Sequence, residues 1–208
     1  MQQTETIFAG SPLRGAKKVL VMLHGRGGSA EDVLSLSDQL NVEGFALIAP
    51  QAANNSWYPF TFMAPPSQNE PALSSSIRTI GDLVTRVSAD GISRDNIYFL
   101  GFSQGACLVL EFTARHAVRY GGIVAFTGGL IGDKIYTGNY KGDFDHTPVF
   151  IGSADPDGHV PVSRVRATTH LLRSMHALVT EKIYDHMGHT VNEDEIREAN
   201  RLIFPKSE

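Results

Sequence analysis

The chain has 208 residues, with 42% hydrophobic and 19% charged residues and a formal net charge of −4. These values are ordinary for a globular protein, and a length near 200 fits one domain over residues 1–208. The sequence has no basic stripe, which disfavours nucleic acid as a partner, and no apolar run of membrane-spanning length, which disfavours stable membrane insertion.

Short apolar runs rich in β-branched residues alternate with longer amphipathic runs along the chain. The apolar runs predict strands at residues 19–23, 45–49, 97–100, 123–126, 149–151 and 180–184. The amphipathic runs predict helices at residues 30–40, 74–87, 106–112, 162–178 and 192–202. Continuous apolar strands indicate a mostly parallel sheet with helices on both faces, so the alternation predicts a doubly wound α/β fold. We expect the glutamates at 193, 195 and 198 to form a solvated helix start.

Residues 50–73 depart from this alternation, because they combine five prolines with several aromatic side chains. A loop of this length inside a compact domain is usually functional. One interpretation is that its side chains form an apolar substrate wall. The other is that they form a satellite hydrophobic cluster at the edge of the core, and the two are compatible. The side chains in question are Trp57, Tyr58, Phe60 and Phe62.

The pentapeptide Gly101-Phe102-Ser103-Gln104-Gly105 is the strongest chemical signal in the chain. It follows a predicted strand and precedes a predicted helix, which is the context of a nucleophile elbow. In that turn the flanking glycines allow a backbone too tight for side chains, and the serine hydroxyl is lifted off the sheet edge. The alternative interpretation is a loop serine that happens to lie between glycines.

Other polar residues follow the later predicted strands. In open α/β sheets, sites form at the carboxyl ends of the strands, so Asp155, Asp157 and His189 are expected near Ser103. A serine hydroxyl needs an imidazole to accept its proton, and the imidazole needs a carboxylate to orient it. His186 is a poorer candidate because it lies nearer the strand. Its spacing with His189 matches no common zinc pattern, so no metal site is expected.

The first predicted strand is followed by His24-Gly25-Arg26-Gly27-Gly28. A histidine-glycine turn lets backbone amides approach a ligand, and it supplies half of the oxyanion hole in hydrolases of this class. The Gln104 amide, directly after the serine, would supply the other half. A phosphate cradle is the competing interpretation, but no Gly-Lys-Ser/Thr follows the glycines.

Together these motifs resemble the phospholipase/carboxylesterase family, which includes the acyl-protein thioesterases. The resemblance rests on the histidine-glycine turn, the pentapeptide at 101–105, the Asp-x-x-Val-Pro ending at Pro161, and Gly188-His189. It implies an α/β-hydrolase fold without a large cap domain, acting on carboxylic or thio esters without a cofactor. It also implies Ser103 as nucleophile, His189 as base, and the Arg26 and Gln104 amides as oxyanion donors.

Two departures from the family pattern bear on the prediction. Related dienelactone hydrolases usually carry cysteine as nucleophile, and the serine here favours an ordinary esterase. Two residues are inserted around the acid, so Asp157 keeps the family spacing to Val160-Pro161 whereas Asp155 keeps the spacing to Gly152. We favour Asp157 as the acid, with Asp155 as the alternative.

The sequence therefore predicts a serine carboxylesterase for small to medium neutral esters, with Met187 joining the loop aromatics in the substrate wall. The alternatives are an acyl thioesterase or lysophospholipase-type hydrolase, and a hydrolase-fold binding protein that has lost catalysis. We expect a monomer or homodimer with a small-molecule ester as substrate. The single cysteine, Cys107, and the lack of signal-peptide character in residues 1–10 lead us to expect a cytoplasmic protein.

Overall fold

The computed structural model describes residues 5–206. Residues 1–4, which belong to the segment judged to lack signal-peptide character, lie outside the described part, as do residues 207–208. The strands are β1 (Thr6–Gly10), β2 (Lys18–Leu23), β3 (Phe45–Pro50), β4 (Ile97–Phe102), β5 (Gly122–Phe126), β6 (Pro148–Asp155) and β7 (Leu178–Asp185). The α-helices are α1 (Ala30–Leu34), α2 (Ala72–Ala89), α3 (Gln104–Arg115), α4 (Val162–Ser174) and α5 (Glu193–Leu202).

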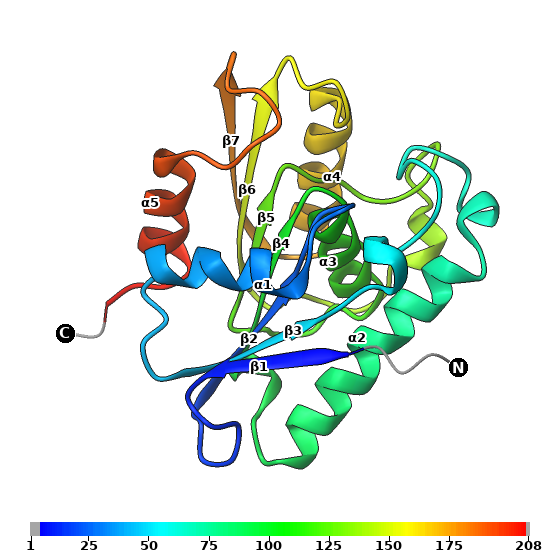
Figure 1. Cartoon of the computed structure of the whole chain (residues 1–208). Helices are drawn as coiled ribbons and strands as arrows, with labels where there is room; N and C mark the ends of the chain where they lie inside the picture. Colours follow the sequence, from blue (N-terminus) through cyan, green and yellow to red (C-terminus); the bar gives the residue numbers. More distant parts are fainter. Residues whose placement is uncertain (1–4, 207–208) are drawn as a thin grey trace.

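Within residues 5–206 the strands form one seven-stranded sheet in the order β1-β3-β2-β4-β5-β6-β7 (Figure 1). Strands β2 to β7 run parallel, and β1 pairs antiparallel with β3 at one edge. This arrangement confirms the predicted α/β-hydrolase fold with a mostly parallel sheet.

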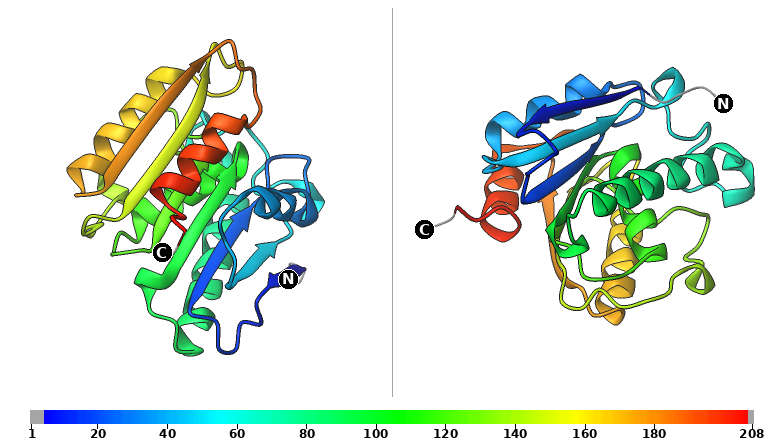
Figure 2. Two further views of the ribbon diagram at one scale, coloured as in Figure 1. Left: turned by 90° about the vertical axis from the view of Figure 1, so that its left-hand side faces the viewer. Right: turned by 90° about the horizontal axis from the view of Figure 1, so that it is seen from below.

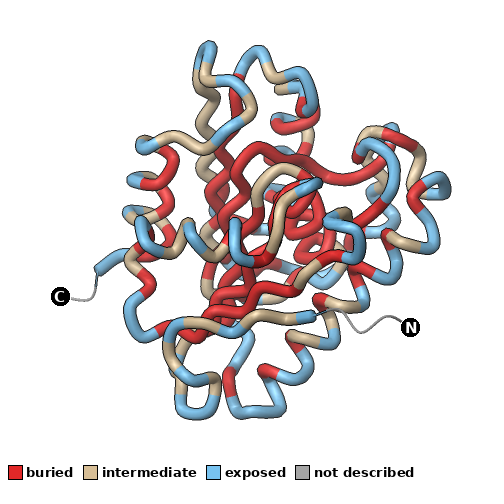
Figure 3. Tube along the Cα trace, in the orientation of Figure 1, coloured by how far each residue is buried: buried red, intermediate tan, exposed pale blue. Residues whose placement is uncertain are grey.

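Helices cover both faces of the sheet, which explains why the strands read as continuous apolar runs. Alternate residues of β2 point to opposite faces: Val19 and Val21 pack with α2, α3 and α4, whereas Leu20 and Met22 pack with α1 and α5. The sheet separates the two layers of helices in the right-hand view of Figure 2. Strands β2 to β6 form the buried centre of the molecule, whereas the two edge strands are largely only partly buried (Figure 3).

Three elements differ from the sequence prediction. Strand β1 was not predicted, because it has only five residues and none of them is fully buried. The helix predicted at 30–40 is α-helical only to Leu34 and continues as a 3₁₀ helix at Ser35–Gln39, where the Ser35 hydroxyl donates to the Asp32 carbonyl (2.7 Å). Helix α4 ends at Ser174, so the segment up to 178 turns into β7 instead.

Parallel strands bring their carboxyl ends to one edge of the sheet. The segments that follow β2, β4, β6 and β7 therefore meet at this edge, although they are far apart in the chain. Helix α3, which begins directly after β4, is buried almost all round between the sheet and its neighbours. The edge thus carries loops on a rigid support.

Candidate active site

Ser103 lies in the sharp turn between β4 and α3, with a strained backbone (φ 53°, ψ −116°). A Cβ at Gly101 would lie 2.5 Å from the backbone of Gly105, and a Cβ at Gly105 would lie 2.1 Å from the carbonyl oxygen of Leu23. Both positions therefore require glycine. The turn is held to β5 by the Ser103 N–H, which donates to the Phe126 carbonyl (2.9 Å). The local geometry is that of a nucleophile elbow.

His189 and Asp157 come to Ser103 from two other strand ends. His189 lies in the loop between β7 and α5, and Asp157 lies in the loop between β6 and α4. The Nδ1–H of His189 donates to Asp157 Oδ2 (2.8 Å), because a carboxylate can only accept. This tautomer leaves Nε2 to accept a hydrogen bond from the Ser103 hydroxyl (2.8 Å). The three side chains thus form one continuous hydrogen-bonded chain.

The Asp157 carboxylate has a fully buried side chain with both oxygens satisfied. Its Oδ1 accepts hydrogen bonds from the backbone N–H groups of His159 (2.7 Å) and Val160 (2.9 Å). Burial alone would raise the pKa of Asp157, but the hydrogen bonds from His189 and the two amides outweigh it and lower the pKa below its usual value. Asp155, by contrast, is exposed at the end of β6, and His189 pairs with Asp157.

Two aromatic rings flank the imidazole of His189, and neither of them is predicted from the sequence to take part in the site. The ring of Phe102 lies 5.3 Å from it and the ring of His159 lies 4.8 Å from it, measured between centroids. Both residues belong to motifs already singled out, so their chain position was visible. The packing of their rings on His189 could not be predicted, because it depends on the conformation of the loops.

Two backbone amides lie beside the serine turn without protein partners. Arg26 follows β2, and Gln104 is the first residue of α3. Within residues 5–206, neither backbone N–H donates to a protein acceptor. The N–H of Gln104 is one of the unpaired donors that every helix N-terminus carries. Gly25, the residue before Arg26, lies against the serine turn, because a Cβ built on it would be 3.4 Å from Ser103 Cβ.

His24 supports the turn that carries Arg26. Its Nε2 accepts from the Ala52 N–H (3.1 Å), and its Nδ1–H therefore donates to the Gly25 carbonyl (2.7 Å). Burial lowers the pKa of His24 below its ordinary value, although the bond to Gly25 opposes that shift. A neutral, buried ring with both nitrogens hydrogen-bonded holds this turn in place, which is a structural role.

The loop between β3 and α2 packs more deeply than a substrate wall would. Trp57 and Tyr58 are only 3% and 1% exposed, and Phe62 is also buried, so these three side chains belong to the core. Of the five residues expected to form the wall, Phe60 is 54% exposed and Met187 is half-buried. The structure thus favours the hydrophobic-cluster interpretation for the buried three, which support the loop from beneath.

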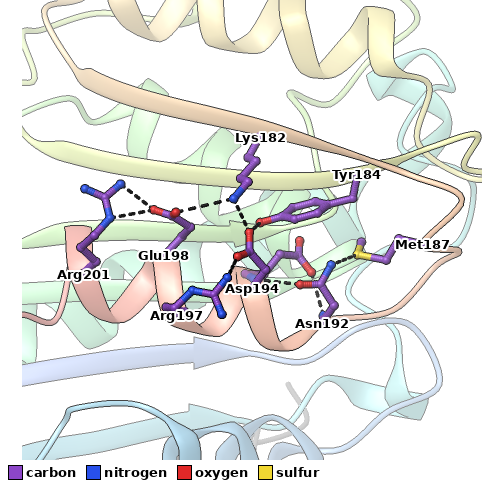
Figure 4. Close-up of polar contacts among 9 residues, drawn as sticks. Lys182, Tyr184, Met187, Asn192, Asp194, Arg197, Glu198 and Arg201 are labelled. Carbon is purple, nitrogen blue, oxygen red and sulfur yellow. Dashed lines mark hydrogen bonds and ion pairs between the residues drawn. The ribbon is translucent and has the colours of Figure 1, made fainter.

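Polar contacts between β7 and α5 hold the loop that carries His189 (Figure 4). The Asn192 side chain caps α5 by accepting from the Glu195 N–H (2.8 Å), and its amide group donates to the Met187 sulfur. Below the loop, Tyr184 donates to Asp194 Oδ2 (2.8 Å), which also pairs with Lys182. Both ends of the histidine loop are therefore anchored.

Other features of the described residues lie away from this chemistry. A hollow of about 880 Å³ lies at the amino ends of β2 and β3, the opposite end of these strands from Ser103. Residues 5–206 contain no group of three or more histidine, cysteine, aspartate or glutamate side chains placed to hold a metal ion. In the same part of the chain, no helix is both long and apolar enough to cross a membrane.

Comparisons with known proteins agree with the resemblance drawn from the motifs. The model of the Phospholipase/Carboxylesterase family matches residues 5–204. A crystal structure of a phospholipase/carboxylesterase from Dyadobacter fermentans is 52% identical, covers 98% of this chain and 97% of its own, and superimposes with a TM-score of 0.96.

Curated relatives are more distant. A probable carboxylesterase of Arabidopsis thaliana is 23% identical over 88% of this chain and 76% of its own length. Acyl-protein thioesterase 1 of Kluyveromyces lactis is 29% identical over 73% of this chain and 75% of its own. Because the family model spans nearly all of the described residues, this chain belongs to the phospholipase/carboxylesterase family of α/β hydrolases and is a carboxylic ester hydrolase.

Proposed function

We propose that the protein is a serine carboxylesterase that uses Ser103 as nucleophile, His189 as general base and acid, and Asp157 as the triad acid. The observation that carries this proposal is the hydrogen-bonded chain from Asp157 through His189 to Ser103, with 2.8 Å at each link. A neutral imidazole whose Nε2 already accepts from the hydroxyl is poised to take its proton.

The proposed reaction proceeds through an acyl-enzyme. Ser103 Oγ attacks the ester carbonyl while its proton passes to His189 Nε2, and the imidazolium formed is stabilised by the Asp157 carboxylate. When the tetrahedral intermediate collapses, His189 returns that proton to the leaving alkoxide, and the acyl group stays on Ser103. A water molecule then attacks the acyl-enzyme while one of its protons passes to His189 Nε2. When this second tetrahedral intermediate collapses, the bond to Ser103 Oγ breaks, His189 returns the proton to Oγ, and the carboxylic acid leaves.

The negative oxygen of the tetrahedral intermediate needs hydrogen-bond donors in place before it forms. We assign this role to the backbone N–H groups of Arg26 and Gln104, which flank the serine turn and have no protein acceptor within residues 5–206. Loss of one such donor typically costs about 3 kcal/mol in the activation barrier. No metal or cofactor is required by this scheme.

The accessible apolar surface favours small to medium neutral esters. Most of the loop aromatics are buried in the core, which leaves Phe60 and Met187 as candidates for direct contact with an acyl chain. The second candidate function is an acyl thioesterase, because several relatives carry the name acyl-protein thioesterase 1. That activity would require a longer acyl groove than this limited surface suggests.

An ester and thioester panel of increasing chain length tests the proposal. We expect the wild-type protein to turn over p-nitrophenyl acetate and butyrate with a burst of p-nitrophenol, and the Ser103→Ala variant to lose this activity. A preference for long-chain thioesters over short esters would favour the thioesterase alternative. A folded wild-type protein with no turnover of any member would contradict both.

The remaining expectations about this enzyme stay proposals. We propose that residues 1–208 form one domain, that the enzyme is a monomer or homodimer, and that it acts in the cytoplasm, where its single buried Cys107 would remain reduced. Light scattering of the purified protein and fractionation of the source cells test the last two of these.

A further inference from the structure

A short loop, residues 56–60, contacts both residues that carry the proposed oxyanion amides. On one side, the Arg26 guanidinium donates to Ser56 Oγ (2.9 Å) and the Pro59 carbonyl (2.9 Å) through Nη1, and to the Phe60 carbonyl (2.6 Å) through Nη2. Among the residues that the structure describes, its hydrogen-bond partners are all neutral oxygens of the same loop. The side chain is therefore committed to the loop rather than to an acidic partner.

On the other side, the Gln104 side chain grips the same loop. Its Oε1 accepts from the Trp57 N–H (2.9 Å), and its Nε2 donates to the Tyr58 carbonyl (2.8 Å). Nε2 also lies 3.4 Å from Ser56 Oγ, so one hydroxyl contacts both Arg26 and Gln104. Gln104 is buried, and its side-chain amide is matched by polar groups of this loop on both its oxygen and its nitrogen.

The loop itself is fixed independently of these two side chains. The Ser76 hydroxyl of α2 donates to the Trp57 carbonyl (2.7 Å), and the Trp57 indole N–H donates to the His24 carbonyl (2.9 Å). One residue before the loop, the Asn55 carbonyl accepts from the Gly27 N–H (2.7 Å). The Ser76 contact anchors the loop to α2, outside both oxyanion elements, whereas the other two contacts fix the loop to the turn that carries Arg26.

We propose that residues 56–60 form a brace that sets the spacing of the two oxyanion amides, with Arg26 and Gln104 acting through their side chains as positioning residues. The inference rests on the proposed function. The two amides come from separate elements, the turn after β2 and the first turn of α3, and a single rigid segment ties them together. A displacement near 1 Å at such a site can cost about 100-fold in rate.

A brace of this kind has a distinctive kinetic consequence. The oxyanion exists only in the transition state and the tetrahedral intermediates, so misplaced amides lower kcat and leave KM nearly unchanged. Transition-state analogues are weakened in the same proportion. A merely structural contact would instead lower the stability of the protein without this selective loss.

The test compares three brace variants with two controls. Ser56→Ala removes the shared hydroxyl, whereas Arg26→Met and Gln104→Met remove the polar ends of the two gripping side chains at similar length. Ser74→Ala and Arg119→Met are the matched controls, because their side chains also make hydrogen bonds, to Glu70 Oε1 and the Asp145 carbonyl, outside the brace. The readouts are kcat and KM for p-nitrophenyl butyrate, the inhibition constant of butylboronic acid, and circular dichroism.

We expect Ser56→Ala to lower kcat about tenfold with KM changed less than twofold, and each methionine variant to lower kcat about 10- to 100-fold. In each variant the inhibition constant of butylboronic acid should rise by the same factor by which kcat falls. The double variant Arg26→Met/Gln104→Met should lose little more than the worse single variant, because both act through one segment.

Three results would overturn the brace. The first is that the brace variants fold and keep the wild-type kcat. The second is that the variants change KM alone. The third is that the fold-losses in kcat of the two single methionine variants multiply in the double variant. Failure of the proposed function has a separate signature, since wild-type protein would then show no Ser103-dependent turnover at all, and both inferences would fall together. An active wild type with unaffected brace variants would refute the brace alone.

Discussion

Glu195 has a buried carboxyl group whose effect on the stability of the protein can be measured directly. The side chain is fully buried at the start of α5, where Oε2 accepts from the Asn192 N–H (2.9 Å) and Oε1 has no partner within the described residues. It packs so closely on β6 that a Cβ at Gly152 would lie 2.2 Å from Oε1. Burial raises the pKa of Glu195 from 4.5 to about 7, against the opposing effect of the Asn192 bond.

The raised pKa fixes the sign and size of its effect on stability. Below pH 4.5 the carboxyl is protonated in both folded and unfolded chains and carries no penalty. Between pH 4.5 and 7 only the unfolded chain ionises, so the free energy of unfolding falls as pH rises, and above pH 7 the loss is constant. A shift of this size corresponds to a total loss of about 3 kcal/mol.

The Glu195→Gln variant isolates this effect, because glutamine keeps the capping acceptor but cannot ionise. Urea denaturation at pH 5 and pH 8 should show that the wild type loses roughly 2–3 kcal/mol more than the variant between these values. All other titrating groups are common to both proteins and cancel in the comparison. Equal losses in the two proteins would refute the reasoning.

Three further predictions follow from single contacts. Asp157→Asn should lower kcat at least 1,000-fold on the scale of a triad acid, whereas Asp155→Asn should stay within threefold, as steady-state ester kinetics would show. Gly105→Ala should destabilise the fold by about 3 kcal/mol or more in urea titrations, because its Cβ would clash with the Leu23 carbonyl. Glu111→Ala should cost about 3 kcal/mol by the same measurement, because it strips a buried partner from the Ile131 amide and the Arg115 side chain; an unchanged midpoint would contradict this.

The parts of the fold and site that the sequence predicts are those encoded by local pattern. Apolar runs predict the parallel strands, because burial on both faces removes polar alternation. The pentapeptide around Ser103 predicts its turn, because close backbone approaches at Gly101 and Gly105 tolerate no side chain. Once the strands are placed, the segments carrying Asp157 and His189 are expected at the same edge.

The parts that the sequence did not predict depend on tertiary contacts. Strand β1 has five residues, none of them fully buried, so its pattern is too weak to detect alone. The sequence around Trp57 and Tyr58 is equally compatible with a substrate-binding wall and with the hydrophobic core. Only their packing against α2 and α3 shows that they belong to the core. Glu195 lies in a run of acidic residues typical of a solvated helix start, yet it is buried against Gly152. The hydrogen bonds from Arg26 to residues 56–60 correspond to no sequence motif, so the sequence does not predict them.

The central claim, that Ser103 is an activated nucleophile, is tested most directly by labelling with a fluorophosphonate probe and locating the adduct by peptide mass spectrometry. We predict one adduct on the peptide that contains Ser103, formed by the wild-type protein and abolished by Ser103→Ala and by prior denaturation. An adduct at another residue, or a folded wild-type protein that stays unlabelled, would contradict the mechanism.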